Sequence, residues 1–189
     1  MAETSERPPL RVVITGGPCS GKTTVIEALA ERGFRTVPEA AIEVIAELSE
    51  RMGVEGQAQW RSENREAFQV MIIEKQAALE EAAAGAASGD VFHDRGRLDG
   101  LAYCRVFGAP VPPEVEAGCQ DLPYDRVFLL DTLSSFDDRK ATGRTSDRER
   151  SLEIRDELGR TYAERGLEPV FVPETSVEER ITLILAELG

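Results

Sequence analysis

The chain has 189 residues, a length that suits one domain built around one hydrophobic core. It is 41% hydrophobic and 30% charged, as ordinary globular proteins are, and no apolar run reaches the ~18 residues that a membrane-spanning helix needs. The net charge of −13 argues against bulk binding to nucleic acid or anionic lipid, although a local basic cluster could still hold a small anion.

The first residues are polar and lack the apolar core of a secretory signal, so we expect a cytoplasmic protein. The cysteines Cys19, Cys104 and Cys119 form no CxxC pair, and His93 is the only histidine. These residues are too few and too scattered for a structural zinc site. His93 alternates with Asp94 in an apolar run, so we expect its side chain to face the interior of a sheet rather than a catalytic triad.

Apolar runs predict five strands, at residues 10–15, 34–38, 90–94, 126–130 and 169–172. Helical spacing predicts helices at residues 24–32, 40–51, 60–84, 98–107 and 151–165, and a last helix that begins with a Ser176–Glu179 capping box. Strands that alternate with helices predict a three-layer α/β fold, with a parallel sheet of about five strands covered on both faces. We expect residues 1–9 to be a flexible tail and residues 10–189 to form the single domain.

The first predicted strand runs into GGPCSGKT, which has the spacing of a phosphate-binding loop. Glycines let the backbone N–H groups turn toward phosphate oxygens, and the following helix adds the positive end of its dipole. Lys22 would reach the β- and γ-phosphates of ATP or GTP, and the Thr23 hydroxyl would bind Mg²⁺. The residues expected to contact the nucleotide are Gly16, Gly17, Pro18, Cys19, Ser20, Gly21, Lys22, Thr23 and Thr24.

Carboxylates end two further predicted strands, Glu39 in VPEAA and Asp94 in VFHDRG. Ligands of parallel sheets lie beyond the carboxyl ends of the strands, so both acids should open onto the phosphate side. Phosphoryl transfer needs one group that holds Mg²⁺ and one base that orients the attacking hydroxyl. We expect Asp94 in the metal shell and Glu39 at the acceptor hydroxyl, with the reverse assignment open. The alternative for each residue is a helix N-cap without a catalytic role.

Arginines supply the remaining candidates. Arg95 follows Asp94 directly and is expected to hold an oxygen of the acceptor, the alternative being a surface ion pair. Residues 139–150 carry five basic and two acidic side chains. Arg144 and Arg148 lie one helical turn apart in this segment, so we expect an arginine-bearing lid over the transferred phosphoryl group. A solvated helix start with ion pairs is the alternative.

Together these features resemble the P-loop kinase-like family often labelled "AAA family ATPase". The resemblance is to its small-domain group, which includes the ribosylnicotinamide kinase domain of the bacterial NAD regulator. The stretches that carry it are ITGGPCSGKTT, VPEAA, FHDRGRLDGLAYC, DRVFLLD and VEERI, which extend over nearly the whole chain. The layout is also similar to deoxynucleoside and thymidylate kinases. That likeness implies a base at Glu39, an acid–arginine pair at Asp94 and Arg95, and a lid with Arg144 and Arg148.

The resemblance implies a three-layer P-loop fold and an ATP-dependent phosphotransferase. With Mg²⁺, it would move the γ-phosphate to a hydroxyl or phosphate of a small nucleoside- or nucleotide-like acceptor. The signatures of a nucleoside acceptor pocket are not evident, so the acceptor remains open. Gln76 lies where such kinases can read an acceptor base, although a surface glutamine on a helix is the more ordinary expectation. The alternative function is an NTP hydrolase or nucleotide-controlled switch. A nucleic-acid end kinase is disfavoured, because a groove for a strand needs a basic stripe.

Overall fold

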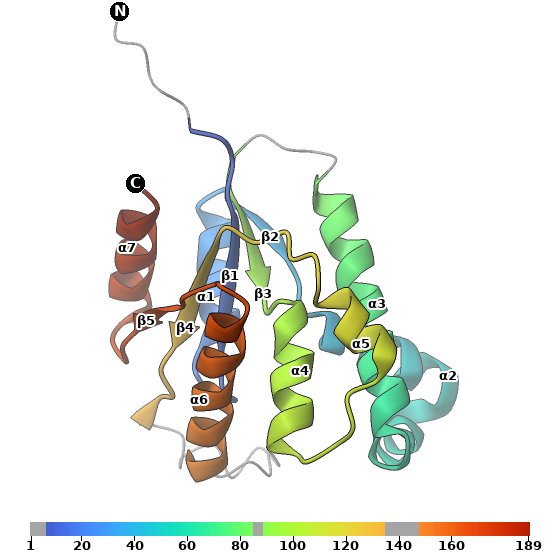
Figure 1. Cartoon of the computed structure of the whole chain (residues 1–189). Helices are drawn as coiled ribbons and strands as arrows, with labels where there is room; N and C mark the ends of the chain where they lie inside the picture. The colour runs from blue at the N-terminus through green and yellow to red at the C-terminus, as the bar shows by residue number, and fades with distance from the viewer. Residues whose placement is uncertain (1–6, 85–88, 135–147) are drawn as a thin grey trace, which may run out of the picture.

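Five parallel strands form the centre of the protein, in the order β2-β3-β1-β4-β5 (Figure 1). The computed structural model describes residues 7–84, 89–134 and 148–189. The strands are β1 (Arg11–Gly16), β2 (Arg35–Val37), β3 (Val91–Asp94), β4 (Arg126–Leu130) and β5 (Val170–Val172). The three-layer α/β fold and all five predicted strands are thereby confirmed.

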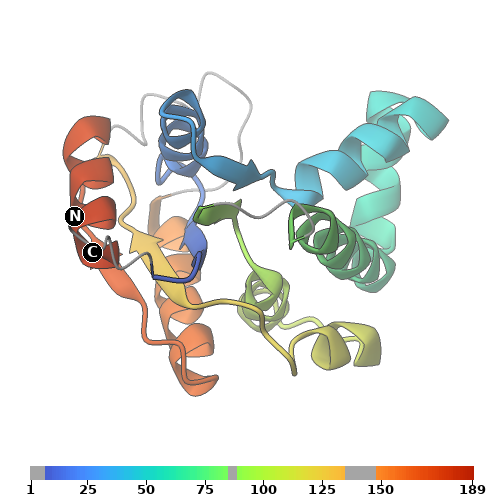
Figure 2. The ribbon, with the colours of Figure 1, turned by 90° about the horizontal axis from the view of Figure 1, so that it is seen from above.

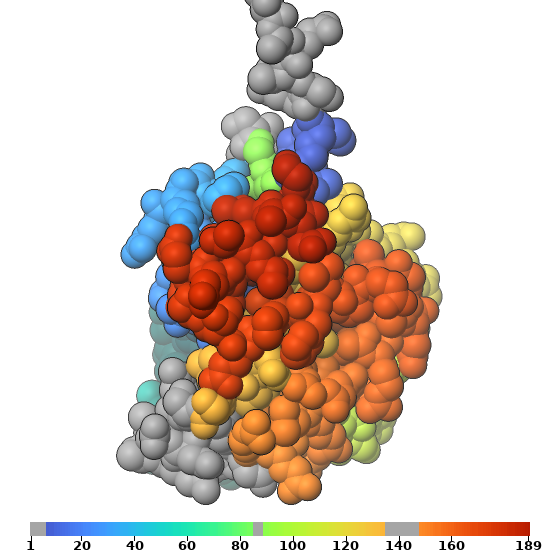
Figure 3. Space-filling model, turned by 90° about the vertical axis from the view of Figure 1, so that its left-hand side faces the viewer, coloured from blue at the N-terminus to red at the C-terminus, as the bar shows by residue number. Residues whose placement is uncertain are grey.

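Alternation along the strands divides the core into two halves. Val12, Ile14 and Phe128 face α1 (Lys22–Glu31) and α7 (Val177–Leu188). Figure 3 shows α7 beside α6 (Arg148–Glu164) at the β5 side of the molecule. The predicted capping box begins α7: the Glu179 amide donates to Ser176 Oγ at 3.3 Å, and the Ser176 amide donates to Glu179 Oε2 at 3.2 Å.

The opposite face of the sheet packs on more helices. Val13 and Val127 lie in a core with residues of α3 (Arg65–Ala84), α4 (Arg97–Val106), α5 (Pro113–Gly118) and α6. The sequence did not predict α5, because its proline-rich start reads as a loop. Proline is nevertheless well suited to the first position of a helix, where its missing N–H has no intrahelical partner. No helix in the described ranges is long and apolar enough to cross a membrane.

The helix predicted at residues 60–84 is two helices. α2 (Ala40–Glu63) extends well beyond residue 51, and the chain reverses at Asn64, where α3 starts. The Asn64 amide and its Nδ2 both donate to the Trp60 carbonyl, at 2.8 and 2.9 Å, which ends α2. Gly53 interrupts α2 with a φ of 77°. The resulting pair of helices projects to one side of the sheet (Figure 2).

The buried face of α3 is also more polar than its apolar spacing suggests. The helical spacing of Phe68, Ile72 and Leu79 predicts that they face inward, but all three are partly exposed. The buried residues are instead Ile73, Gln76 and Glu80. Burial of the two polar ones is tolerated because Glu80 accepts hydrogen bonds from Gln76 at 2.9 Å, from Arg97 at 2.7 Å and from Tyr124.

Candidate active site

The glycine loop joins β1 to α1 and is held from outside by α6. A Cβ atom on Gly17 would lie 2.4 Å from the Ser151 carbonyl oxygen, so only glycine fits this approach. Ser151 Oγ also donates to the Pro18 carbonyl at 2.7 Å. Gly21 has a φ of +81°, a conformation that favours glycine, immediately before the helix begins. The contacts with α6 and the left-handed turn at Gly21 therefore hold the loop in a defined shape.

Lys22 folds back over this loop. Its Nζ donates to the carbonyls of Gly16 and Gly17, both at 2.9 Å, and to Ser20 Oγ at 3.2 Å. Burial lowers the pKa of Lys22 to about 7, and the nearby Arg95 lowers it further, against the opposing pull of the acids around it. An anion in the loop would favour the charged ammonium.

The other residues of the glycine loop and the first turn of α1 differ in their exposure to solvent. Cys19 is buried with a φ of 56°, in the left-handed region that few non-glycine residues adopt. Thr23 and Thr24 lie in the exposed first turn of α1. The hydroxyl of Thr23 is therefore accessible to a ligand from solvent.

Asp94 ends β3 directly beside β1, where it pairs in register with Ile14. Its carboxylate is buried, and among the described residues its Oδ1 has no hydrogen-bond partner. Burial, followed by repulsion from Glu39, raises the pKa of Asp94 to about 6. A buried carboxylate oxygen without a partner is costly for the free protein, and a ligand that supplies a cation would remove that cost.

Arg95 connects the glycine loop to the second strand-end acid. Its Nε lies 3.1 Å from Glu39 Oε1, and its Nη1 donates to the Gly16 carbonyl at 3.4 Å and to Asp99 Oδ2 at 2.9 Å. Its backbone is strained, with a φ of 73°. The side chain is 14% exposed, so the ion pair with Glu39 is largely buried and not a surface contact.

Neither acid serves as a helix cap. Glu39 occupies the N-cap position of α2, but its side chain makes no capping hydrogen bond within the described part of the chain. The N-cap of α4 is Gly96, two residues after Asp94. Helix capping, the alternative role for these residues, therefore does not account for the position of either carboxylate.

Asp99 accepts the hydrogen bonds that hold the buried floor of this site together. Its position in the sequence is only a weak indication of this role. Its two oxygens accept from Thr15 Oγ1 at 2.7 Å, from Arg95 at 2.9 Å and from Tyr162 OH at 2.8 Å. The donors come from β1, α6 and the segment between β3 and α4. A local sequence pattern cannot predict this cluster, because its members come from distant parts of the chain and meet only in the folded protein.

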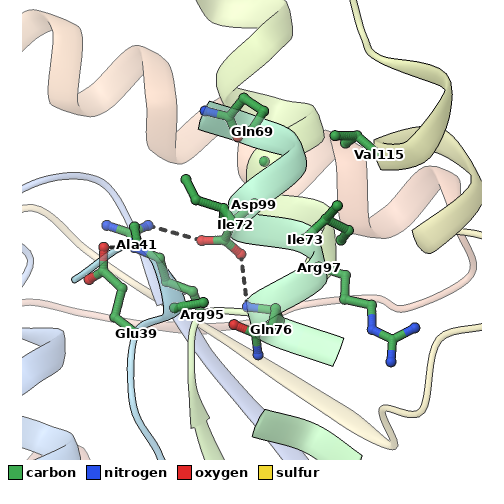
Figure 4. A pocket seen from close by; sticks show the side chains of 13 residues that line it. Glu39, Ala41, Gln69, Ile72, Ile73, Gln76, Arg95, Arg97, Asp99 and Val115 are labelled. Atoms are coloured by element: carbon green, nitrogen blue, oxygen red, sulfur yellow. Dashed lines mark hydrogen bonds and ion pairs between the residues drawn. The ribbon is translucent and has the colours of Figure 1, made fainter. Parts of the chain in front are cut away.

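A small chamber lies between α2, α3 and α4 and holds about 30 Å³ (Figure 4). Glu39 and Arg95 lie on one side of it, and Gln69 lies on another. Gln76 also lines it and is buried, so the expectation of a surface glutamine is wrong. We call this space the inner chamber.

The arginines predicted to form a lid are only partly described. Arg144 lies outside the described residues, and Arg148 is the exposed first residue of α6. Arg148 lies one helical turn before Ser151, which contacts the glycine loop. In the same turn Arg150 pairs with Glu153 at 2.7 Å, as expected for a solvated helix start.

Arg180 is a site residue that sequence reasoning missed. It is 2% exposed, and its guanidinium donates to the carbonyls of Ser20 at 2.5 Å and Pro173 at 3.1 Å. It thus ties the glycine loop to the end of β5. Nothing in the sequence separates it from the other charges of α7.

The described residues contain no cluster of three or more histidine, cysteine or acidic side chains able to hold a metal ion. Mg²⁺ does not require such a cluster, since it is usually bound by one or two protein oxygens together with substrate phosphates and water. The exposed Thr23 hydroxyl and the unpartnered Asp94 oxygen are oxygen donors of that type.

Solved structures with the same fold include two kinases that act on nucleosides or nucleotides and the NadR protein. Deoxyadenosine kinase from M. mycoides, with products dCMP and a flexible dCDP bound, aligns with a TM-score of 0.63 at 16% identity, over 95% of this chain and 98% of that one. Thymidylate kinase from Candida albicans aligns with a TM-score of 0.61 at 12% identity, over 96% and 91%. NadR protein in complex with NAD and AMP-PNP aligns with a TM-score of 0.67 at 21% identity, over 95% of this chain and 48% of that one.

At these identities the likeness establishes the fold alone. No curated protein matches the sequence. A family model described as an AAA domain matches residues 11–180, which include the glycine loop, both strand-end acids and Arg180. The chain therefore belongs to this AAA domain family, and it has the three-layer fold of P-loop kinases.

Proposed function

We propose that the protein is a phosphotransferase that moves the γ-phosphoryl group of ATP or GTP, with Mg²⁺, to a hydroxyl of a small acceptor. The observation that carries the proposal is the position of Arg95. This one guanidinium contacts Gly16 of the glycine loop at 3.4 Å and Glu39 of the inner chamber at 3.1 Å. A donor site and an acceptor site that share one cation suit transfer between two bound molecules better than storage of one nucleotide.

The size of the inner chamber supports a hydroxyl as the accepting group. The inner chamber is small, at about 30 Å³, and a hydroxyl on one carbon is the smallest accepting group that could reach Glu39 in it. Glu39 is the base: it accepts the hydroxyl proton while that oxygen bonds to the γ-phosphorus and the bond from phosphorus to the leaving nucleoside diphosphate breaks. Arg95 holds Glu39 in place and stabilises charge on the transferred group.

The donor half uses the glycine loop. In this proposal the backbone of Gly16, Gly17, Pro18, Cys19, Ser20, Gly21 and Thr24 surrounds the phosphates. Lys22 exchanges its contacts with the loop carbonyls for contacts with β- and γ-phosphate oxygens. Thr23 and Asp94 hold Mg²⁺, which supplies charge neutralisation of the phosphates when bound. The contact of α6 with the loop supports Arg148 as part of the cover.

Hydrolysis is the second candidate, because a chamber of about 30 Å³ also admits one water molecule. The two functions are separated by measuring release of ADP with and without acceptors. Nucleosides, nucleotides and nicotinamide riboside are each supplied with ATP and Mg²⁺, and one sample contains no acceptor. We expect at least one acceptor to raise ADP release well above the control. Equal turnover in all samples, the control included, would establish hydrolysis and refute the transferase.

A further inference from the structure

A second and larger space adjoins the inner chamber. It holds about 490 Å³, within the range of small-molecule sites. We call it the outer cavity. Its lining includes Arg61, Arg65, Phe68, Gln69, Tyr103 and Phe107. The inner chamber is much smaller than the outer cavity, so the body of an acceptor whose hydroxyl enters the chamber would lie in the larger space.

One stripe of α3 lines both spaces. Arg65 and Gln69 line the outer cavity, whereas Gln69, Ile72 and Gln76 line the inner chamber. These four positions are spaced by four, three and four residues, so they share one face of the helix. The eleven residue steps from Arg65 to Gln76 correspond to roughly 16 Å along the helix axis.

A matching stripe runs along α4 in the opposite direction. Gly96 and Gly100 line the inner chamber, and Tyr103 and Phe107 line the outer cavity, again with spacings of four, three and four. Where the stripes pass from one space to the other the helices are in close contact: a Cβ atom on Gly100 would lie 3.0 Å from Gln69 Oε1. Gln69 lines both spaces, so they adjoin along the groove between α3 and α4, with the Gln69 side chain at their junction.

The far end of this groove is basic in a strongly acidic protein. Arg61 and Arg65 line it, against one acid, Glu66. In the described part of the chain neither arginine forms an ion pair with a carboxylate. Arg61 donates through Nε to Gln57 at 2.7 Å, and its guanidinium lies 5.3 Å from the centre of the Phe68 ring. A third guanidinium, that of Arg150, lies 5.5 Å from the centre of the Phe107 ring.

We infer that the acceptor is an elongated anion, with its reacting hydroxyl in the inner chamber and a carboxylate or phosphate at its remote end, held by Arg61 and Arg65. This inference rests on the proposed function for the direction of binding. Arginine forks match the geometry of carboxylate and phosphate, and the aromatic rings between the two ends suit a planar body. A neutral molecule of the same shape leaves the two guanidinium groups without an anion.

The test compares acceptors that differ only at the remote end. The pairs are uridine with 5-carboxymethyluridine and adenosine with N6-carboxymethyladenosine; each keeps a free 5′-hydroxyl, and the second member carries its carboxylate on the base, at the end away from the ribose. Equilibrium binding by calorimetry and ADP release are both measured. We expect the anionic member of at least one pair to bind about 10- to 100-fold more tightly than its neutral partner. Equal or weaker binding of the anionic member in every pair overturns the inference.

The variants Arg65→Gln and Arg61→Gln test the residues. Each is expected to remove most of the preference for the anion while changing affinity for the neutral member and for ATP by less than about threefold. The matched control is Arg51→Gln, an exposed arginine of the same helix pair that lines neither space. If Arg65→Gln weakened binding of the anionic and the neutral member equally, Arg65 would not be the residue that holds the remote anion. Anion-selective binding without any acceptor-dependent ADP release would refute the phosphotransferase but not the anionic site.

Discussion

Arg95 and Glu39 form an ion pair in which 3.1 Å separates Nε from Oε1, and this contact joins the end of β3 to the start of α2. The two residues are far apart in the sequence but meet beside the glycine loop. A carboxylate held by a fixed guanidinium has a defined direction, which a general base requires. The pair is therefore the centre of the proposed reaction.

Glu39→Gln should lower the rate of phosphoryl transfer by about 10²- to 10⁴-fold, because the amide cannot accept the hydroxyl proton. Affinity for ATP should stay within about twofold, because Glu39 belongs to the acceptor side. Acceptor-dependent ADP release and nucleotide binding are measured together. The matched control is Glu43→Gln, an exposed glutamate one turn further along α2. Full activity in Glu39→Gln would show that the base is another residue.

Lys22→Ala should abolish NTP turnover, by at least about 10²-fold, since the proposed role of the ammonium is to contact the β- and γ-phosphate oxygens. Binding of a fluorescent ATP analogue should weaken in parallel. Lys75→Ala serves as the control, because that lysine pairs with Glu47 on the projecting helices. Turnover at the wild-type rate in Lys22→Ala would exclude the glycine loop as the donor site.

Asp99→Ala should destabilise the protein by about 3–5 kcal/mol, because a buried guanidinium and two buried hydroxyls lose their acceptor. Chemical denaturation measures the free energy of unfolding. Asp156→Ala is the comparison: Asp156 pairs with Arg155 at the surface, and its loss should cost less than about 1 kcal/mol. Similar small costs for both variants would contradict the role of Asp99 in holding the floor of the site together.

Sequence periodicity and motif spacing were sufficient for the sheet, the glycine loop and the two strand-end acids. Buried parallel strands are uniformly apolar, and a loop that binds phosphate has a short local pattern. The failures were at α2 and α3. There the reversal at Asn64 depends on one side chain, and the inner face carries Gln76 and Glu80, which are satisfied only by partners from elsewhere in the chain. Long-range contacts of this kind leave no local pattern.

Asp99 and Arg180 were underestimated or missed for the same reason. Each is a charged residue in a helix, where surface charges are common. Only the tertiary structure shows that Asp99 accepts from Thr15 and Tyr162, and that Arg180 reaches the Ser20 carbonyl.

Stability should depend on pH through His93. Burial lowers the pKa of this imidazole to about 4 in the folded protein, with Glu80 opposing the shift and Arg11 and Arg97 adding to it. Between pH 4 and the ordinary value near 6.5, the unfolded chain binds more protons than the folded one. His93 therefore contributes stability that is complete above pH 6.5 and is lost as the pH falls toward 4, by up to roughly 3 kcal/mol.

His93→Leu should remove this dependence. The free energy of unfolding is measured from pH 4 to 7.5 for both proteins, and the difference between them reports His93 alone, because other titrating groups are shared. We predict that the free energy of unfolding of the wild type, minus that of His93→Leu, decreases as the pH falls from 6.5 toward 4. A difference that is constant with pH would show that His93 is not held neutral by burial.

The contribution of Asp94 to stability changes with pH in the opposite direction to that of His93. Its pKa is raised from 3.8 to about 6, so the folded state binds more protons between these values, and stability falls as the pH rises through them. Asp94→Asn should therefore stabilise the free protein at pH 7 by roughly 1–3 kcal/mol while stopping transfer. Thermal unfolding and ADP release test the two parts. Destabilisation at pH 7 would mean that the buried charge is compensated in the free protein.

The most direct measurement of the central claim is the balance of products from one reaction. The protein is incubated with ATP, Mg²⁺ and the best acceptor, and mass spectrometry and a phosphate assay quantify ADP, phosphorylated acceptor and inorganic phosphate. We predict that phosphorylated acceptor forms in the same amount as ADP, and that Glu39→Gln lowers both together. ADP matched by inorganic phosphate, with no phosphorylated acceptor, would contradict the account.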